Sequence, residues 1–273
     1  MTLSTSSRYP ASTPEEEREQ RYDIYRKLAP LYDLIMHGVD YPDWTDYIDT
    51  IIRYHHPHAT KLLELACGTG TMALFMEKRD DYEITATDIS PEMIRIAGRK
   101  GETEKSKVEW LVRDMRRIEL SETFDIIYMV FDSLNYLHNE KDIHAVLESA
   151  RQHLKPDGSF IFDFTTPNYS PVIAPLLNEE RNVNEHYSYR RFSNYDHLKQ
   201  MHINHFLVEK KDRDTGKITD RFEEIHQQRI WSFDEIMTLI AQSNLVVDAA
   251  YEDFDLSAAD ENSERITMVL KHG

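Results

Sequence analysis

The sequence predicts an α/β fold in which a mostly parallel sheet of seven strands has helices on both faces. Three observations carry this prediction. From residue 61 onward, short apolar segments alternate with segments of helical periodicity. Two glycines follow the first apolar segment, where a strand turns into a helix. After the fifth apolar segment the rhythm changes to longer segments of mixed polarity, which predict an antiparallel insertion.

A tail and two helices are predicted before the sheet. Residues 1–20 are polar and are expected to be a disordered tail. A helix is expected from Glu15 to Leu28, because acidic residues fill the first turn after a Thr13-Pro14 capping signal. A second helix is expected at residues 42–54, since its apolar residues recur on one stripe: Trp44, Tyr47, Ile48, Ile51 and Ile52.

The alternating segments follow in chain order. The strands are expected at residues 61–67, 83–88, 108–114, 124–132 and 159–164. The helices between them are expected at residues 71–79, 91–97 and 141–154. The last helix ends at Lys155-Pro156-Asp157-Gly158, which is a turn signal. Strands that alternate with helices in this way are typical of a parallel sheet.

The rest of the chain is expected to add the insertion and to complete the sheet. Residues 168–231 are expected to form three antiparallel strands, with a hairpin loop at residues 212–217. Ser232 and Glu235 form a capping signal for a helix that runs to Asn244. Two closing strands then return to the sheet, so that its domain comprises residues 59–167 and 232–273.

Composition limits the class of partner. The 273 residues include 49 acidic and 32 basic ones, and the net charge of −17 disfavours nucleic acid and anionic membranes as partners. No apolar run approaches the roughly 18 residues that span a bilayer, and the first residues lack the apolar core of a secretory signal. The single cysteine, Cys67, cannot form an internal disulfide. We therefore expect a cytoplasmic protein.

The glycine turn predicts an adenosine cofactor. Gly68 and Gly70 lie between a strand and a helix, where backbone amides can approach a ligand closely. With Ala73 they satisfy the dinucleotide-binding pattern G-x-G-x-x-A. Asp88 ends the next strand, 18 residues after Gly70, which is close to the spacing of a ribose-binding acid.

Two kinds of adenosine cofactor fit this turn, and Glu64 distinguishes between them. A carboxylate four residues before Gly68 would repel the pyrophosphate of NAD(P). The same carboxylate suits S-adenosylmethionine, which carries a sulfonium and an ammonium group and no phosphate. An NAD(P)-dependent oxidoreductase and a non-catalytic protein of the same fold stay as alternatives.

An ordered series of motifs resembles class I S-adenosylmethionine-dependent methyltransferases: LLELACGTGTMAL, ATDISPEMI, WLVRDM and FDIIYMVFDSLNYL. The resemblance implies a Rossmann-like fold, S-adenosyl-L-methionine as cofactor and S-adenosyl-L-homocysteine as product. The family often has glycine at the position of Ala66. By this resemblance the residues that bind the cofactor are Glu64, Ala66, Cys67, Gly68, Gly70, Asp88, Ile89, Met93, Asp114, Met115, Phe131 and Asp132.

The segment before the sheet resembles a narrower branch, that of glycine N-methyltransferase and the bacterial amino-sugar N,N-dimethyltransferases. This resemblance implies that residues 21–58 form a helical lid and that the insertion at residues 168–231 covers the acceptor site. The aromatic residues over the sulfonium would then be Tyr25, Tyr32, Tyr41 and Trp44. The candidates for contact with the reacting groups are Tyr32, Asn135, Tyr136 and His138.

The expected reaction is methyl transfer to a small molecule, with an amine favoured over a hydroxyl or a carboxylate as acceptor. The donor is already activated, so the protein mainly has to align the two reactants and exclude water. We expect no metal, since His55, His56 and His58 lack an accompanying carboxylate or thiol cluster. We expect a monomer or a homodimer. Insertion residues that could contact an acid or a ring of the acceptor are Arg190, Arg191, His202, His205, Arg229 and Trp231.

Overall fold

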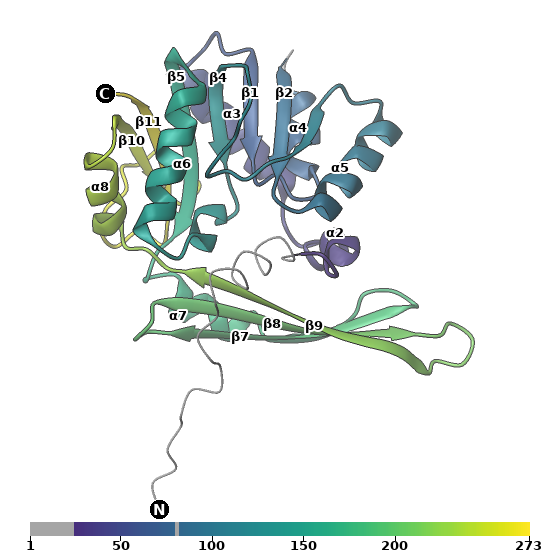
Figure 1. Ribbon diagram of the computed structural model, residues 1–273. Coiled ribbons are helices and arrows are strands. Elements are labelled where there is room, and N and C mark those ends of the chain that lie inside the picture. Colours follow the sequence, from purple (N-terminus) through teal and green to yellow (C-terminus); the bar gives the residue numbers. More distant parts are fainter. Residues whose placement is uncertain (1–24, 80–81) are drawn as a thin grey trace, which may run out of the picture.

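The computed structural model describes residues 25–79 and 82–273. The predicted tail and most of the helix expected from Glu15 to Leu28 lie outside the described residues. The chain forms two sheets (Figure 1). One has seven strands in the order β10-β11-β5-β4-β1-β2-β3, and the other has four strands in the order β6-β7-β8-β9.

The seven-stranded sheet confirms the predicted fold class. Its strands are β1 (Lys61–Leu65), β2 (Glu83–Asp88), β3 (Glu109–Val112), β4 (Phe124–Met129), β5 (Leu154–Thr165), β10 (Leu245–Glu252) and β11 (Arg265–His272). The first five strands pair in parallel, and β11 pairs antiparallel with both β5 and β10. The helices around it are α3 (Tyr41–His55), α4 (Thr71–Glu77), α5 (Pro91–Glu104), α6 (Glu140–His153) and α8 (Phe233–Ala241).

Helices cover the two faces of this sheet with separate apolar clusters. Alternate residues of a strand point to opposite faces, and β1 shows this directly. Leu63 packs in the cluster that contains the buried residues of α6 and α8. Leu62 packs in the cluster that contains those of α3 and α4. A sheet that is buried on both faces explains why its strands are almost continuously apolar.

The order of the strands fixes where a ligand can bind. β1 lies between β2 and β4, so the chain leaves β1 toward one side of the sheet and later returns on the other side. Ligands of open α/β sheets bind outside the carboxyl ends of the strands at such a switch point. The turn after β1 contains Gly68 and Gly70.

The second sheet and a short helix, α7 (Ser170–Leu176), are inserted between β5 and α8. The sheet has four strands and not the predicted three: β6 (Glu179–Asn182), β7 (Tyr187–Asp196), β8 (Met201–Lys211) and β9 (Ile218–Arg229). The sequence of β6 is EERN, which has no apolar alternation to reveal a strand. All pairs in this sheet are antiparallel.

The described start of the chain packs against the second sheet. Two short helices, η1 (Ala29–Leu31) and α2 (Tyr32–Ile35), precede α3. Leu28, Leu31 and Ile35 form a buried cluster whose other members, Tyr189, Phe206 and Val208, come from β7 and β8. In Figure 1 α2 lies between the large sheet and the small one. This segment therefore joins the two sheets.

The predicted turn at residues 155–158 is an irregularity within a strand. Leu154 pairs with Phe124, but the next paired residue, Ile126, lies opposite Ser159. The four residues between them loop out of the register of β5. Gly158 comes close to the neighbouring strand there: an added Cβ would lie 2.8 Å from the Asp125 carbonyl oxygen and 2.9 Å from that of Phe124.

We expect Gly158→Ala to lower the free energy of unfolding by about 1–3 kcal/mol, the usual cost of overpacking a well-packed site. Gly98→Ala is the matched control, because an added Cβ there meets no atom within 4 Å in the middle of α5. The control should raise the free energy of unfolding by up to about 1 kcal/mol. Denaturant unfolding measures both, and equal stability of the two variants would contradict this packing.

Candidate functional site

The turn after β1 has an unusual backbone conformation. Ala66, Gly68 and Gly70 all have left-handed φ values, of 53°, 55° and 74°. An added Cβ on Gly70 would lie 2.5 Å from the Trp110 ring, so this position excludes any side chain. A residue other than glycine in the left-handed conformation destabilises the folded state by roughly 1–2 kcal/mol, and Ala66 is such a residue. This conformation explains why the methyltransferases that the sequence resembles often have glycine at this position.

Asp88 holds the turn from the end of β2. Its side chain is buried, and its two carboxylate oxygens accept hydrogen bonds from the backbone N–H groups of Gly68 (2.9 Å) and Ser90 (2.8 Å). Burial raises the pKa of Asp88 to about 6, although these two bonds act in the opposite direction. The carboxylate is therefore fixed beside the glycine turn, where the spacing predicts the ribose.

Glu64 is a second buried carboxyl group at the same place. It is 2% exposed, and its Oε2 accepts a hydrogen bond from the Tyr128 hydroxyl at 2.9 Å. Burial is the main cause that raises its pKa to about 8, and the nearby Asp88 adds to the effect. Within residues 25–79 and 82–273, neither carboxyl group has a cationic partner within 4 Å. The site thus contains buried acid without a matching positive charge.

The lid segment is tied directly to the glycine turn. Asp33 in α2 accepts hydrogen bonds from the Thr69 hydroxyl and, at 2.9 Å, from Lys100 Nζ in α5. Lys100 also donates to the Thr71 hydroxyl at 2.6 Å. The sequence analysis did not find Lys100, because no local pattern relates α5 to α2. This group of bonds closes the segment over the start of α4.

Phe131, at the end of β4, is surrounded by aromatic rings from the lid. The ring centroids of Tyr41 and Trp44 lie 5.3 Å and 4.5 Å from it. Tyr41 is partly exposed. Trp44 is buried, and Phe254 and the Arg265 guanidinium also pack against its ring. Trp44 therefore supports Phe131, and contact of Trp44 and Tyr41 with the cofactor stays a prediction.

The loop after β4 is fixed by a buried group of charges. Phe131 and Asp132 both have left-handed φ values, of 61° and 59°. The Arg265 guanidinium in β11 donates to the carboxylates of Asp132 and Asp163. Asp163 is fully buried, and it also accepts the backbone N–H of Asp132 at 3.3 Å. These contacts hold a strained turn in place beside the predicted acceptor site.

Hydroxyl groups and an imidazole meet between the two sheets. The hydroxyls of Tyr25 and Tyr136 lie 2.6 Å apart, and His226 Nδ1 in β9 lies 3.4 Å from the Tyr136 hydroxyl. The Tyr25 and Tyr32 rings meet edge to face at 5.4 Å. Burial raises the pKa of all three tyrosines, and Asp88 contributes to the shift of Tyr25 and Tyr32. The tyrosines therefore stay protonated at neutral pH, close to the cofactor end of the site.

Two residues of β9 complete this arrangement, and the sequence analysis missed both. The Glu224 carboxylate accepts the backbone N–H groups of Tyr25 (2.6 Å) and Leu28 (3.0 Å), which fastens the lid to the small sheet. His226 is 2% exposed, and its ring stacks on Tyr25 at 4.2 Å between centroids. The alternation of Phe222, Glu224 and His226 along one strand was the available signal, since it places them on one face.

Two of the residues that were expected to contact the reacting groups bond to backbone groups. Asn135 is fully buried, and its side-chain amide bonds to the backbone of Thr165 and Arg229. We correct the expectation for Asn135, which joins the loop after β4 to β5 and β9. His138 is exposed, its Nε2 lies 2.9 Å from the carbonyl oxygen of Gln227, and its contact with the reacting groups stays a prediction. Tyr32 and Tyr136 remain candidates.

The expected adenine contacts lie along the neighbouring strand ends. Ile89 is partly exposed, and Met93 is buried in the first turn of α5. The Asp114 carboxylate is held by the Arg116 guanidinium and by the Arg116 backbone N–H. Met115 packs on the cluster that contains α6. Cys67 is buried, and burial raises the pKa of its thiol, as expected for a packed residue. Adenine binding here stays a prediction.

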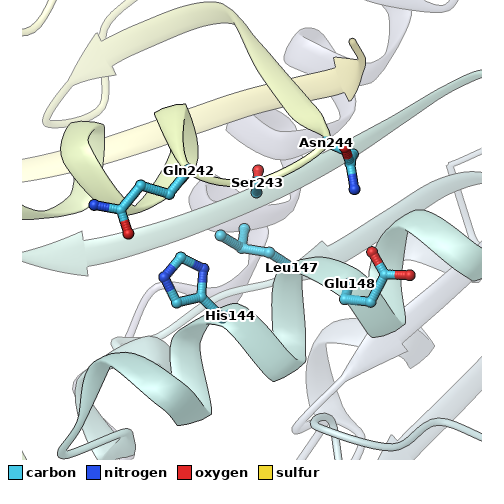
Figure 2. A pocket seen from close by; sticks show the side chains of 6 residues that line it. All are labelled: His144, Leu147, Glu148, Gln242, Ser243 and Asn244. Carbon is cyan, nitrogen blue, oxygen red and sulfur yellow. The ribbon is translucent and has the colours of Figure 1, made fainter.

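The remaining features of the described chain add no residues to this site. A hollow of about 330 Å³ lies between α6 and the turn from α8 to β10. The residues that line it are His144, Leu147, Glu148, Gln242, Ser243 and Asn244 (Figure 2). None of the residues predicted for the site lines it in the described structure. The described residues contain no group of three or more metal-ligating side chains. None of the described helices has the length and apolarity needed to cross a membrane.

Comparisons with known proteins agree with a methyltransferase fold. Residues 62–158 match the family model described as a methyltransferase domain. The chain is 28% identical to the Bacillus subtilis protein YqeM, which is named as a methyltransferase, over 89% of this chain and 95% of the relative. A solved S-adenosylmethionine-dependent methyltransferase from Clostridium acetobutylicum has a TM-score of 0.74 and 25% identity, over 91% of this chain and 99% of its own.

A further relative is an enzyme with a named substrate. It is the dTDP-3-amino-3,6-dideoxy-α-D-glucopyranose N,N-dimethyltransferase of Streptomyces fradiae, 28% identical over 55% of this chain and 58% of its own length. Together the matches favour a methyltransferase over the alternatives of an NAD(P)-dependent oxidoreductase and a non-catalytic protein.

The raised pKa of Glu64 predicts how stability depends on pH. Between its ordinary value of 4.5 and about 8, the folded protein keeps a proton that the unfolded chain has released. The free energy of unfolding of the ligand-free protein should therefore fall as pH rises through this window. Glu64→Gln should flatten this fall between pH 6 and pH 8, and it should weaken S-adenosylmethionine binding by about 100-fold through loss of the charge.

Denaturant unfolding at several pH values and calorimetric titration measure the two effects. The control is Glu102→Gln, since Glu102 is exposed in α5 and the change should leave both properties as in the parent protein. An unchanged pH dependence in Glu64→Gln would show that the buried carboxyl group is not the cause.

Proposed function

We propose that this chain, which its family match and its relatives identify as a class I S-adenosylmethionine-dependent methyltransferase, methylates an amine of a small molecule. The observation that carries the choice of an amine is the pair of hydroxyl groups of Tyr25 and Tyr136, which lie 2.6 Å apart. The tyrosines stay protonated because burial raises their pKa, so they are poor bases. An acceptor that reacts as its free base suits such a site better than an alcohol does.

The described residues fit the cofactor. Glu64 and Asp88 are buried acids without a cationic partner in the described chain, and a ligand with positive charge would balance them. Glu64 would hold the methionine end, and Asp88 would accept hydrogen bonds from the ribose hydroxyls. Tyr41 and Phe131 would present their rings near the sulfonium, worth about 0.5–2 kcal/mol for each cation–π contact. When bound, S-adenosylmethionine supplies a methyl group on a good leaving group.

The acceptor would lie between the lid and the small sheet. Tyr136 would orient the amine nitrogen with its hydroxyl, which Tyr25 fixes from the other side. His226 would hold that hydroxyl from β9, since its Nδ1 lies 3.4 Å away, and the methylated product would leave as an ammonium ion. The lid would exclude water, so that proximity and orientation supply much of the rate.

The similarity to the Streptomyces fradiae enzyme also supports an amine as acceptor, because that relative is named for methylating an amino sugar. The matched part covers 55% of this chain, so the likeness supports the chemistry of the transfer and not a particular sugar. We keep the cytoplasmic location and the monomeric or homodimeric state as predictions.

A screen for product tests the proposal. The protein should release S-adenosylhomocysteine with primary or secondary amines, and mass spectrometry should place the added methyl group on nitrogen. Matched alcohols and carboxylic acids without an amine should give no product above background. Methyl transfer to oxygen with every active compound would overturn the choice of an amine.

Two variants separate binding from transfer in the same assay. Asp88→Ala should lose S-adenosylmethionine binding, because it removes the acceptor of the ribose hydroxyls and of the Gly68 N–H. Tyr136→Phe should keep cofactor affinity but lower kcat about 10- to 100-fold. Tyr54→Phe is the control, since Tyr54 is 70% exposed on α3.

A further inference from the structure

We propose that the acceptor carries an oxyanion, a carboxylate or a phosphate, in addition to its amine, and that Arg191 binds this group. The inference rests on the proposed function, because it places the rest of the acceptor beside the amine site. Arg191 lies in β7, and its cross-strand partner in β8 is Phe206. Phe206 belongs to the cluster that packs against the lid, so Arg191 faces the space between the lid and the small sheet.

Arg191 forms no ion pair within 4 Å in the described part of the chain, and the Glu179 carboxylate on β6 acts on it only from a greater distance. Its Nε donates to the side-chain oxygen of Asn204 at 2.9 Å, and its guanidinium carbon lies 5.3 Å from the Phe206 ring centroid. In the described part of the chain no carboxylate lies within 4 Å of it. Burial lowers the pKa of Arg191, but an arginine in a protein still remains charged. A desolvated cation without an anion is costly, and a bound oxyanion would remove that cost.

Two other arginines of the small sheet form ion pairs. Arg190, the adjacent residue on the outer face, pairs with Glu180 at 3.0 Å. Arg229 pairs with Glu235 at 3.0 Å. Glu179 lies opposite Arg191 on β6 and attracts its charge, but the Glu179 carboxylate accepts the hydroxyl of Tyr189 and forms no ion pair with Arg191. The guanidinium of Arg191 can therefore still bind a ligand.

The surrounding side chains are polar and neutral. His202 is buried, and burial together with the nearby Arg191 lowers its pKa to about 4, so the ring is uncharged at neutral pH. Its Nε2 lies 2.8 Å from the Ser193 hydroxyl. Ser193, His202 and Asn204 can donate hydrogen bonds to an oxyanion, while Arg191 supplies the charge and the two-pronged geometry that carboxylates and phosphates match.

The position of Arg191 sets the shape of the acceptor. Tyr25 and Tyr136 are among the groups that interact electrostatically with Arg191, so the anionic group would lie close to this hydroxyl pair. A compact molecule with an amine at Tyr136 and an oxyanion at Arg191 would fit. The class is therefore an amino acid or an aminoalkyl phosphate, in preference to a neutral amine.

Matched pairs of small probes test this. The pairs are 4-aminobutyrate with 4-aminobutanol, and O-phosphoethanolamine with ethanolamine. For the protein loaded with S-adenosylhomocysteine, calorimetry should show at least about tenfold tighter binding of one anionic member than of its neutral partner. With S-adenosylmethionine, kcat/KM should follow the same preference. The pair that shows it identifies the oxyanion as carboxylate or phosphate.

Variants assign the preference to one side chain. Arg191→Met should abolish it, Arg191→Lys should keep part of it, and Arg190→Met should leave it unchanged, since Arg190 lies on the opposite face. Equal binding of both members of each pair to the parent protein overturns the inference, whether or not the Arg191 variants fold. So does an unchanged preference in Arg191→Met.

The outcomes also separate the two proposals. Methylation of neutral amines at the same rates as their anionic partners would support the proposed function and overturn only the proposal that the acceptor carries an oxyanion. Binding of the anionic probes at Arg191 without methylation of any amine would support the oxyanion site and overturn the proposed function.

Discussion

Burial of two carboxyl groups at the ends of β1 and β2 is the constraint on which the site depends. Glu64 and Asp88 lie under the glycine turn without a cationic partner in the described chain, and burial raises the pKa of each. Such an arrangement lowers the stability of the folded protein at neutral and alkaline pH. A bound ligand with an ammonium and a sulfonium group would stabilise the folded protein, whereas a bound pyrophosphate would destabilise it further. The selectivity for S-adenosylmethionine would therefore come from charge that the protein does not balance by itself.

The lid connects this acidic site to the acceptor site. Asp33 fastens it to the glycine turn through Thr69 and Lys100, and Glu224 fastens it to the small sheet through two backbone N–H groups. The contact with Thr69 ends in the turn that would hold the cofactor. The same short segment carries Tyr25 and Tyr32, which reach toward Asp88 on one side and Tyr136 on the other. One short segment thus contacts both the turn predicted to hold the cofactor and the proposed acceptor site.

Periodicity and spacing predicted the large sheet, the glycine turn and the capping of α8, because each depends on residues close together in the chain. They missed β6, whose sequence lacks alternation, and the roles of Lys100, Glu224 and His226, whose partners lie far away in the chain. Asn135 and His138 were placed correctly near the end of β4, but their bonds go to backbone groups that only the folded chain brings there. Trp44 was on the expected helical stripe, but its packing against Phe131 and Arg265 could not be predicted because both partners lie far away in the chain.

The most direct test of the central claim is the proton balance of cofactor binding. At pH 7 the free protein holds Glu64 largely protonated, since its pKa is about 8. Binding of a positively charged ligand should ionise it and release close to one proton. Calorimetric titration with S-adenosylmethionine in buffers of different ionisation enthalpy measures that number. Release near one proton per site, lost in Glu64→Gln, is the predicted result, and binding with no proton release would contradict it.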